Sequence, residues 1–435
     1  MINIFTTISS SGAVQGIIIG AVLGWYTLEL IAKIKSTKIN GWITIFGYGV
    51  PGNGMVLRAA CTKIFPGPIN VPEEAMYWTT TKDGVGNKLN GQHDYIMHFP
   101  VGQLPPNNAF WSLTMGDAKQ RFVQNSLNRY SVGDRSGLVP NTDGSVDIYI
   151  QHVAPSGHES NWLPSPAGYF IPWLRVYQPG EAILDGTYQV PPIVKAHAQG
   201  AAARPRAMML LDVIYTHPIA SAILALLAWV VYQRLSTGII PLATAAVIVW
   251  PTATFLFIYF WPRLLLNVYK RAALVKGFGD GPIPINTLYT QPQALFADPL
   301  HVTLPPGSSP LMSMGTNRDT LYVVGCLDLS KGPQVLHVPD MADRYYAVQF
   351  TDPSDGTNFA YVGKRVTGTE AGDYLITGPH WKGTIPQGMK QISSPNNSVL
   401  VIGRVFVEND NDLLTAYDLA KQIQLTPLSH ENNLN

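Results

Sequence analysis

Residues 213–233, VIYTHPIASAILALLAWVVYQ, and residues 235–262, LSTGIIPLATAAVIVWPTATFLFIYFWP, are two apolar runs that a single charged residue, Arg234, separates. A helix needs about 20 apolar residues to cross a hydrocarbon core, and each run is long enough. The turn between the runs is too short to be a domain. The pattern therefore predicts a transmembrane hairpin in the middle of the chain. Because a hairpin returns the chain to the side that it left, we expect the parts before and after it to share one compartment.

A third apolar stretch lies at the N-terminus. Met1–Leu28 carries no charged side chain, and Gly12–Ile31 is long enough to span as a helix that Glu29 and Lys33 close. A secretory signal would show a positively charged first region and a small-residue cleavage site, and neither is clear. We therefore expect an uncleaved anchor over residues 1–38, which brings the prediction to about three transmembrane helices.

The charges that flank these spans and the composition of the large parts give opposite orientations. Basic residues follow the first span, precede the second and follow the third, namely Lys33, Lys35, Lys38, Arg204, Arg206, Arg263, Lys270 and Arg271. By the positive-inside rule they place both large parts in the cytoplasm. The aromatic-rich, charge-poor composition instead favours the extracytoplasmic side. The sequence does not resolve this conflict about orientation. We predict an integral membrane protein with both large parts on the same side of the membrane, and of the two sides we favour the extracytoplasmic one.

The composition narrows the class of protein. Charged residues make up 13% of the 435 residues, against about 25% in an average soluble protein. The net charge is +1 and no basic run occurs, so nothing indicates a nucleic-acid partner. The lipid bilayer is the expected partner, with protein partners or a homo-oligomer as further options. Cys61 and Cys326 are interpreted as buried free thiols, and a disulfide between them is the alternative.

Short alternating apolar runs fill both large parts of the chain. The clearest are Asp94–Phe99, Val146–His152, Ile171–Tyr177, Gln334–Val338 and Ser398–Phe406. Short strands bounded by Gly, Pro, Asn and Asp are typical of a β-sandwich or jelly roll. We predict a mainly β fold with two β-sandwich domains, residues 39–200 and residues 277–435. Residues 201–276 form the hairpin and an exit helix, and a helix over Asp410–Gln424 closes the second domain.

Two sets of motifs resemble known families. The first set consists of Phe110–Asp117, Asn125–Asp134, Asp143–Ser145, Asn161–Pro164 and Leu174–Tyr177. It resembles the family of domains of unknown function numbered 1214 (DUF1214). The second set consists of Thr316–Tyr322, Leu327–Pro333, Asp343–Tyr346, Tyr361–Arg365 and Gly378–Gly383. It resembles the companion family DUF1254.

The resemblance implies a jelly-roll-like fold for the first region and an immunoglobulin-like sandwich for the second. In the long soluble relatives the DUF1254-like part comes first, and here the order is reversed. The chain therefore resembles a fusion of two short proteins, each with its own membrane anchor. The families have no settled reaction. The resemblance therefore supplies a fold, and it implies neither a mechanism nor a cofactor.

Polar and aromatic residues gather in the loops of the first region. The candidate ligand-binding residues there are Trp111, Arg129, Asp134, Asn161 and Trp162. One interpretation is a polar network that holds long loops onto a sandwich, because buried polar groups must be paired. The other is a ligand cleft in which a tryptophan serves as an aromatic platform for a sugar ring or a lipid head group.

A second group of candidates lies in the C-terminal region and consists of Asn317, Asp319, Arg344 and Arg365. Arginines near aspartates could bind a carboxylate or phosphate, and ion pairs between strand ends are the structural alternative. The stretch Asp352–Asn358 has alternating oxygen ligands, but it lacks the distal Glu of a calcium loop.

Catalytic and metal-binding motifs are missing from the sequence. There is no Gly-x-Ser-x-Gly nucleophile elbow and no His-Glu-x-x-His zinc motif. His93, His98 and His152 lie on or beside strands of one predicted sandwich, but no spacing rule supports a metal site. We expect no metal and no cofactor.

Two functions remain. The favoured one is a non-enzymatic, membrane-anchored structural or ligand-binding component of an envelope or membrane-bounded particle. The alternative is an enzyme or binder that acts on carbohydrate or lipid at a site between the two sandwiches.

Overall fold

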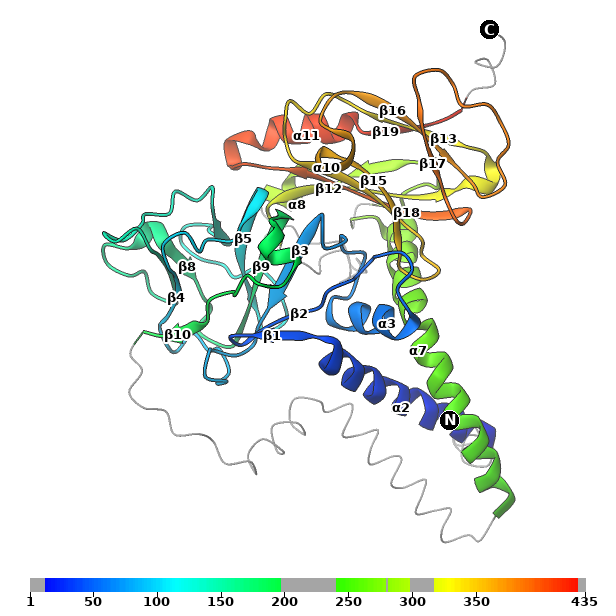
Figure 1. Cartoon of the computed structure of the whole chain (residues 1–435), viewed down its shortest axis with the longest axis horizontal. Helices are drawn as coiled ribbons and strands as arrows, with labels where there is room; N and C mark the ends of the chain where they lie inside the picture. The colour runs from blue at the N-terminus through cyan, green and yellow to red at the C-terminus, as the bar shows by residue number, and fades with distance from the viewer. Residues whose placement is uncertain (1–11, 197–239, 279–280, 298–316, 429–435) are drawn as a thin grey trace. The chain divides into compact units, whose positions relative to one another are not determined.

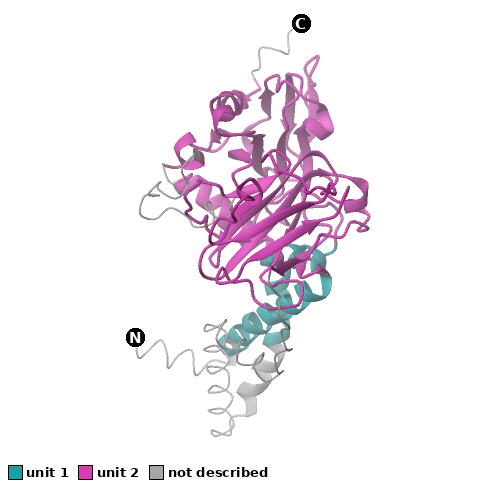
Figure 2. Cartoon of the chain, turned by 90° about the vertical axis from the view of Figure 1, so that its left-hand side faces the viewer, with its two compact units in different colours: residues 1–35, 54–63, 198–261 teal, residues 36–53, 64–197, 262–435 magenta. Residues whose placement is uncertain are grey.

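The computed structural model describes residues 12–196, 240–278, 281–297 and 317–428. The chain forms two compact units (Figure 2). A helical unit contains residues 1–35, 54–63 and 198–261, and a β-rich unit contains residues 36–53, 64–197 and 262–435. The first run of the predicted hairpin, residues 213–233, lies outside the described residues.

The helical unit is built on close packing between two apolar helices. It contains α2 (Gly12–Lys35), α3 (Met55–Ile64) and the first part of α7 (Ile240–Lys276) (Figure 1). Gly20 and Gly24 lie four residues apart, and therefore on one face of α2. A Cβ atom added at Gly20 would lie 2.3 Å from the Cβ of Ala253, and one added at Gly24 would lie 2.8 Å from the Phe257 ring. The missing side chains thus let α2 and α7 approach each other closely.

Two of the described helices are long and apolar enough to cross a membrane by length and composition. They comprise Val14–Lys35 of α2 and Val249–Lys276 of α7. Signal sequences and buried core helices can have the same length and composition. These helices coincide with the predicted N-terminal anchor and with part of the predicted hairpin.

The first β region contains two sheets. One has the strand order β1-β2-β3-β9-β5-β6 and the other the order β10-β4-β7-β8. The strands are β1 (Thr37–Ile39), β2 (Trp42–Thr44), β3 (Ala75–Thr79), β4 (Tyr95–Phe99), β5 (Asn107–Asp117), β6 (Ser131–Gly133), β7 (Val146–Gln151), β8 (Trp162–Pro164), β9 (Phe170–Pro179) and β10 (Ile193–Lys195). A short helix, α4 (Glu181–Leu184), follows β9. Buried rings connect the two sheets, since Phe99 on β4 contacts Trp111 on β5 with 5.6 Å between ring centroids.

The second β region also contains two sheets. Their strand orders are β11-β12-β18-β14-β15 and β17-β16-β13-β19. The strands are β11 (Leu288–Thr290), β12 (Thr320–Asp328), β13 (Gln334–Val338), β14 (Tyr346–Thr351), β15 (Asn358–Gly363), β16 (Gly372–Thr377), β17 (Lys390–Ser393), β18 (Ser398–Phe406) and β19 (Gln424–Pro427). The helices of this region are α8 (Gln293–Ala297), α10 (Lys364–Thr367) and α11 (Leu413–Gln422).

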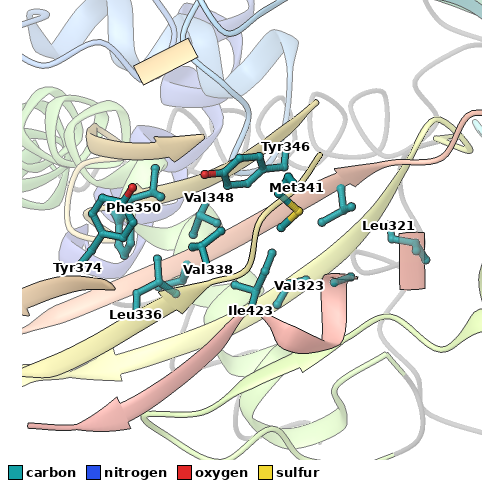
Figure 3. Packing of buried hydrophobic residues seen from close by; sticks show 14 of the residues in the cluster. Leu321, Val323, Leu336, Val338, Met341, Tyr346, Val348, Phe350, Tyr374 and Ile423 are labelled. Carbon is teal, nitrogen blue, oxygen red and sulfur yellow. The ribbon is translucent and has the colours of Figure 1, made fainter. Parts of the chain in front are cut away.

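Apolar residues from both sheets of the second region share one core (Figure 3). Leu321 and Val348 come from β12 and β14, while Leu336 and Val338 come from β13, and all four are fully buried. Ala416 and Ala420 of α11 are buried in the same cluster. Because successive residues of a strand point to opposite faces, the alternate residues of β12 and β18 point away from this core. The described chain is mainly β, as predicted.

Both cysteines are free and buried, as interpreted from the sequence. Cys61 lies on α3 and Cys326 on β12. Burial raises the pKa of the Cys61 thiol to about 12 and that of the Cys326 thiol to about 11. Since the thiolate is the reactive form, neither thiol is a candidate nucleophile.

Candidate functional site

The outward face of the first six-stranded sheet carries aromatic and polar side chains. Along β9, Leu174 and Val176 alternate with Trp173, Arg175 and Tyr177, so the second group lies on the face opposite to the apolar pair. Tyr77 of β3 is the direct cross-strand partner of Arg175. An arginine thus lies in the middle of a buried sheet face, beside a tyrosine.

The sheet of the second region has the same arrangement on its outward face. Arg404 on β18 is the cross-strand partner of Tyr322 on β12, and its guanidinium carbon lies 5.7 Å from the centroid of that ring. Val324, Leu400 and Ile402 share this face and form a small cluster apart from the sheet's own core.

The two outward faces meet. Phe110 of β5 contacts Phe406 of β18 with 4.4 Å between ring centroids. The Ser112 hydroxyl donates a hydrogen bond to the buried carboxylate of Asp319 (2.5 Å). The Asn317 amide donates to the Tyr177 hydroxyl (3.4 Å). These contacts join β5 and β9 of the first region to the start and end of the sheet in the second.

A cavity of about 160 Å³ lies where the two faces meet. Both arginines line it. The other lining residues are Phe65, Pro66, Gly67, Pro68, Ile69, Tyr77, Gln120, Trp173, Tyr177, Tyr269, Phe278, Asn317, Tyr322, Val324, Leu400 and Ile402. Within the described ranges, the lining therefore carries two positive charges and no acidic side chain.

Arg404 is held by neutral groups. Its Nη1 donates hydrogen bonds to the side-chain oxygens of Asn70 and Gln349 (2.8 Å each), and Nη2 donates to the carbonyl oxygen of Pro68 (3.1 Å). The residue is only 4% exposed. Since arginine stays protonated in proteins, its charge is buried without a bonded carboxylate.

Arg175 is equally buried but has fewer partners. It is 4% exposed, and its Nη1 donates to the Thr114 hydroxyl (2.9 Å). No other hydrogen bond or ion pair of this guanidinium is present among the described residues. Because the guanidinium group has five N–H donors, most of them have no hydrogen-bond partner among the described residues, and the guanidinium carbon lies 5.5 Å from the centroid of the Trp173 ring.

Three phenols add further donors. The Tyr77 oxygen accepts a hydrogen bond from the Asn70 amide (3.0 Å), and the Tyr322 oxygen accepts one from the Asn317 amide (2.9 Å). Burial raises the pKa of Tyr77, although the Arg404 charge acts against it. Burial also raises the pKa of Tyr177 well above its usual value. The hydroxyls of Tyr77 and Tyr177 therefore stay protonated at neutral pH and can donate to an acceptor in the cavity.

Among the residues predicted from the sequence, Arg129 and Asn161 hold loops. Arg129 Nη1 donates to the carbonyl oxygens of Glu159 (2.6 Å) and Trp162 (3.0 Å). Asn161 accepts from the backbone nitrogen of Val139 and donates to its carbonyl oxygen, at 2.8 Å each. Neither residue lines the cavity.

The other three candidates of the first region are also bound within it. Asp134 accepts a hydrogen bond from the backbone nitrogen of Trp111 (3.1 Å), and burial raises the pKa of its carboxyl group. The Trp162 indole donates to the Gln151 carbonyl oxygen (2.9 Å). None of the five predicted residues of this region lines the cavity.

In the second region, Asn317 is the predicted residue that lines the cavity. Asp319 lies nearby at the junction of the faces, where it forms an ion pair with Arg135. The Arg135 guanidinium carbon lies close to the rings of both Phe110 and Phe406, at 4.9 and 4.8 Å from their centroids.

Arg344 and Arg365 have carboxylate partners. Arg344 forms two hydrogen bonds with Asp412, of 2.5 and 2.7 Å. Arg365 Nε donates to Glu74 (2.7 Å), whose carboxylate also accepts from the Tyr345 hydroxyl (2.9 Å). Both arginines therefore lie in ion pairs outside the cavity lining.

Within the described part of the chain, no group of three or more His, Cys, Asp and Glu side chains is placed to hold a metal ion. His93, His98 and His152 make separate contacts. His98 bonds Asp147, and His152 bonds the Ser165 carbonyl oxygen.

Sequence reasoning missed the two arginines and their tyrosines. A usable signal existed, because both arginines interrupt an apolar strand, in Leu174-Arg-Val and Gly403-Arg-Val. A charge inside a central strand must have a buried polar environment.

Both β regions match models of known protein families. Residues 74–181 match DUF1214, and residues 298–427 match DUF1254, each a family of proteins of unknown function. Each family model thus matches one part of the chain, DUF1214 in the first β region and DUF1254 in the second. Arg175 lies in the DUF1214 match and Arg404 in the DUF1254 match, so each family region contributes one arginine to the cavity.

Solved structures show a limited likeness. The VPA0106 protein of Vibrio parahaemolyticus is 32% identical over 33% of this chain, with a TM-score of 0.29, and the match covers 35% of the Vibrio chain. The chain thus spans about a third of the length of that protein. An uncharacterised protein of Burkholderia cenocepacia is 15% identical in sequence, with a TM-score of 0.41. The match covers 78% of this chain and 74% of the Burkholderia chain. No curated protein matches the chain.

Proposed function

We propose that the protein is a membrane-anchored binding protein that takes up a small anion in the cavity between the two facing sheets. One observation carries this proposal: the guanidinium group of Arg175 is buried, lines the cavity and has one hydrogen bond, to a neutral hydroxyl.

The energetics favour an anionic ligand. Burying a charge without a counter-charge costs several kcal/mol. Arg404 adds a second buried charge whose bonded partners are all neutral. An oxyanion beside Arg175 would compensate this charge, and hydrogen bonds between a guanidinium and an anion are among the strongest in proteins.

The lining favours binding over catalysis. Its described residues include no carboxylate, histidine, cysteine, serine or threonine, which are the usual general bases and nucleophiles. The buried phenols keep their protons, because burial raises the pKa of Tyr77 and of Tyr177. The alternative of an enzyme at this site therefore has no candidate base in the lining.

Apolar helices support the membrane part of the proposal. Only 17% of the apolar window of α7 is buried, whereas the core helix of a soluble protein would be mostly buried. Large apolar side chains such as Phe255, Tyr259 and Leu264 are exposed along it. We further propose that α2 and the first part of α7, which belongs to the helical unit, span the bilayer with a third helix from the hairpin. Both β regions, each a β-sandwich (jelly-roll-like, then immunoglobulin-like), then lie on the extracytoplasmic side.

The test is anion binding by the full chain in lipid nanodiscs. Benzoate, acetate, phosphate and sulfate are titrated at fixed ionic strength, and the melting temperature is recorded. At least one anion should raise the melting temperature of the wild type and leave that of Arg175→Gln unchanged. Arg121→Gln is the matched control, because Arg121 is 67% exposed and pairs with Asp117 outside the cavity lining. A wild type that none of the four anions stabilises, or an Arg175→Gln variant that keeps the full effect, would refute the proposal and leave a structural role.

A further inference from the structure

We infer that the anion is an aromatic monocarboxylic acid of on the order of ten non-hydrogen atoms. This rests on the proposed function and adds the class of ligand. Three properties of the cavity lead to it, namely its size, its walls and the kind of donor that it presents.

The size limits the ligand. A water-sized group needs about 10–15 Å³ of such volume, so a cavity of about 160 Å³ takes on the order of ten non-hydrogen atoms. A long-chain fatty acid or an oligosaccharide is too large to be enclosed. A single-ring acid with a short side chain fits.

The walls favour an aromatic body. Seven of the lining residues have aromatic rings, and they are Phe65, Tyr77, Trp173, Tyr177, Tyr269, Phe278 and Tyr322. Phe65 contacts both Trp173 and Tyr77 in tilted geometry, with centroid distances of 5.5 and 6.0 Å. Aromatic pairs prefer such tilted or offset contacts, so a ring in the cavity could add to this cluster.

The walls also disfavour a sugar. A sugar presents many hydroxyl groups that need both donors and acceptors, and the lining has few acceptors. The side-chain amide of Asn317 already has hydrogen-bond partners within the protein. Its nitrogen donates to the Tyr322 hydroxyl, and its oxygen accepts from the Asp319 backbone nitrogen. The half-buried Gln120 is the other amide in the lining.

The donors suit a carboxylate with a single negative charge. The planar guanidinium fork of Arg175 matches the two oxygens of a carboxylate, and the phenols of Tyr77 and Tyr177 supply neutral donors. Arg404 contributes its charge, but the three hydrogen bonds to Asn70, Gln349 and Pro68 already occupy much of its donor capacity. A tetrahedral dianion would need more free charged donors than this lining presents.

The experiment compares four probes by titration calorimetry on the full chain in nanodiscs. The probes are 3-phenylpropanoate, its neutral isostere 3-phenylpropanamide, octanoate and inorganic phosphate. We expect 3-phenylpropanoate to bind at least tenfold more tightly than each of the other three. Arg175→Gln should remove the difference between the acid and its amide, and Arg121→Gln should keep it.

The outcomes separate the two proposals. Tighter binding of phosphate, or equal binding of octanoate, would overturn the aromatic monocarboxylate and leave anion binding in place. Equal binding of the acid and the amide would overturn the role of the charge, and with it both proposals. Absence of binding by the two carboxylates and phosphate would also overturn both.

Discussion

Arg175 and Arg404 occupy corresponding positions in the two sheets that face each other. Each lies on a strand with hydrogen-bonded neighbours on both sides, and each is paired across the ladder with a tyrosine. Their partners differ, however. Arg404 donates to three neutral oxygens, whereas Arg175 donates to one hydroxyl. We infer that Arg404 is mainly a structural cation and that Arg175 is the one available to a ligand.

This difference predicts opposite effects on stability. Arg404→Met leaves the oxygens of Asn70, Gln349 and Pro68 without their donor, and we expect a loss of about 3 kcal/mol, since an unsatisfied buried group costs roughly 1–3 kcal/mol. Arg175→Met removes a buried, uncompensated charge and one hydrogen bond, so the change should stay within about 1 kcal/mol. Unfolding of both variants in the same detergent provides the measurement. Equal destabilisation by the two substitutions would contradict the assigned roles.

A second prediction concerns acid stability. Burial alone would raise the pKa of Asp412, but the hydrogen bonds from Arg344 and from the Glu408 backbone nitrogen lower it below its usual value of 3.8. A lowered pKa means that the unfolded chain takes up the proton first as the pH falls. The pair therefore contributes fully above the usual pKa, and its contribution is lost as the pH falls through the folded pKa.

Asp412→Asn should accordingly destabilise the protein by about 2 kcal/mol at pH 7, a typical value for a charged hydrogen bond. The difference in unfolding free energy between Asp412→Asn and the wild type should shrink toward zero as the pH falls below the folded pKa of Asp412. The check is the unfolding free energy measured as a function of pH. Asp418→Asn is the control, because Asp418 is exposed on α11, the helix that begins directly after Asp412. A difference that is the same at every pH would show that the ion pair is not its source.

Local patterns predicted much of the fold. The strands Gln334–Val338 and Ser398–Phe406 have the same bounds in the structure, because each has its own apolar periodicity. The short strands β1, β6 and β10 were not predicted. They are three residues long, and only pairing with a neighbouring strand makes them regular.

The cavity was harder to predict for a physical reason. Sequence reasoning chose polar residues at loops, such as Arg129 and Asn161, because Asn, Asp and Gly gather at turns. The cavity is instead built from side chains in the middle of strands. Which face Arg175 presents follows from β-strand alternation, but the second sheet that meets this face is determined by packing between regions far apart in the sequence.

A third prediction concerns the packing of α2 against α7. Gly20→Leu would place a side chain where Ala253 Cβ lies 2.3 Å from the added Cβ and the Trp250 carbonyl oxygen lies 2.7 Å from it. The two helices must then separate, because small residues are what allows such close approach in membranes. The melting temperature in detergent should fall by several degrees. Ile17→Phe adds bulk at a residue that is 56% exposed and should have little effect. An unchanged Gly20→Leu variant would argue against this helix pair.

The fourth prediction tests the topology that follows from the hairpin. Both β regions should lie on the same side of the membrane, so trypsin added to sealed vesicles should cleave both or neither. Lys119 and Lys382 are exposed and provide one tryptic site in each region, and mass spectrometry of the fragments identifies which was cut. Detergent-opened vesicles serve as the control, in which both sites should be cleaved. In vesicles whose outer face corresponds to the extracytoplasmic side, we expect cleavage at both residues. Cleavage at only one would refute the hairpin, and protection of both would reverse the orientation toward the one that the flanking basic residues favour.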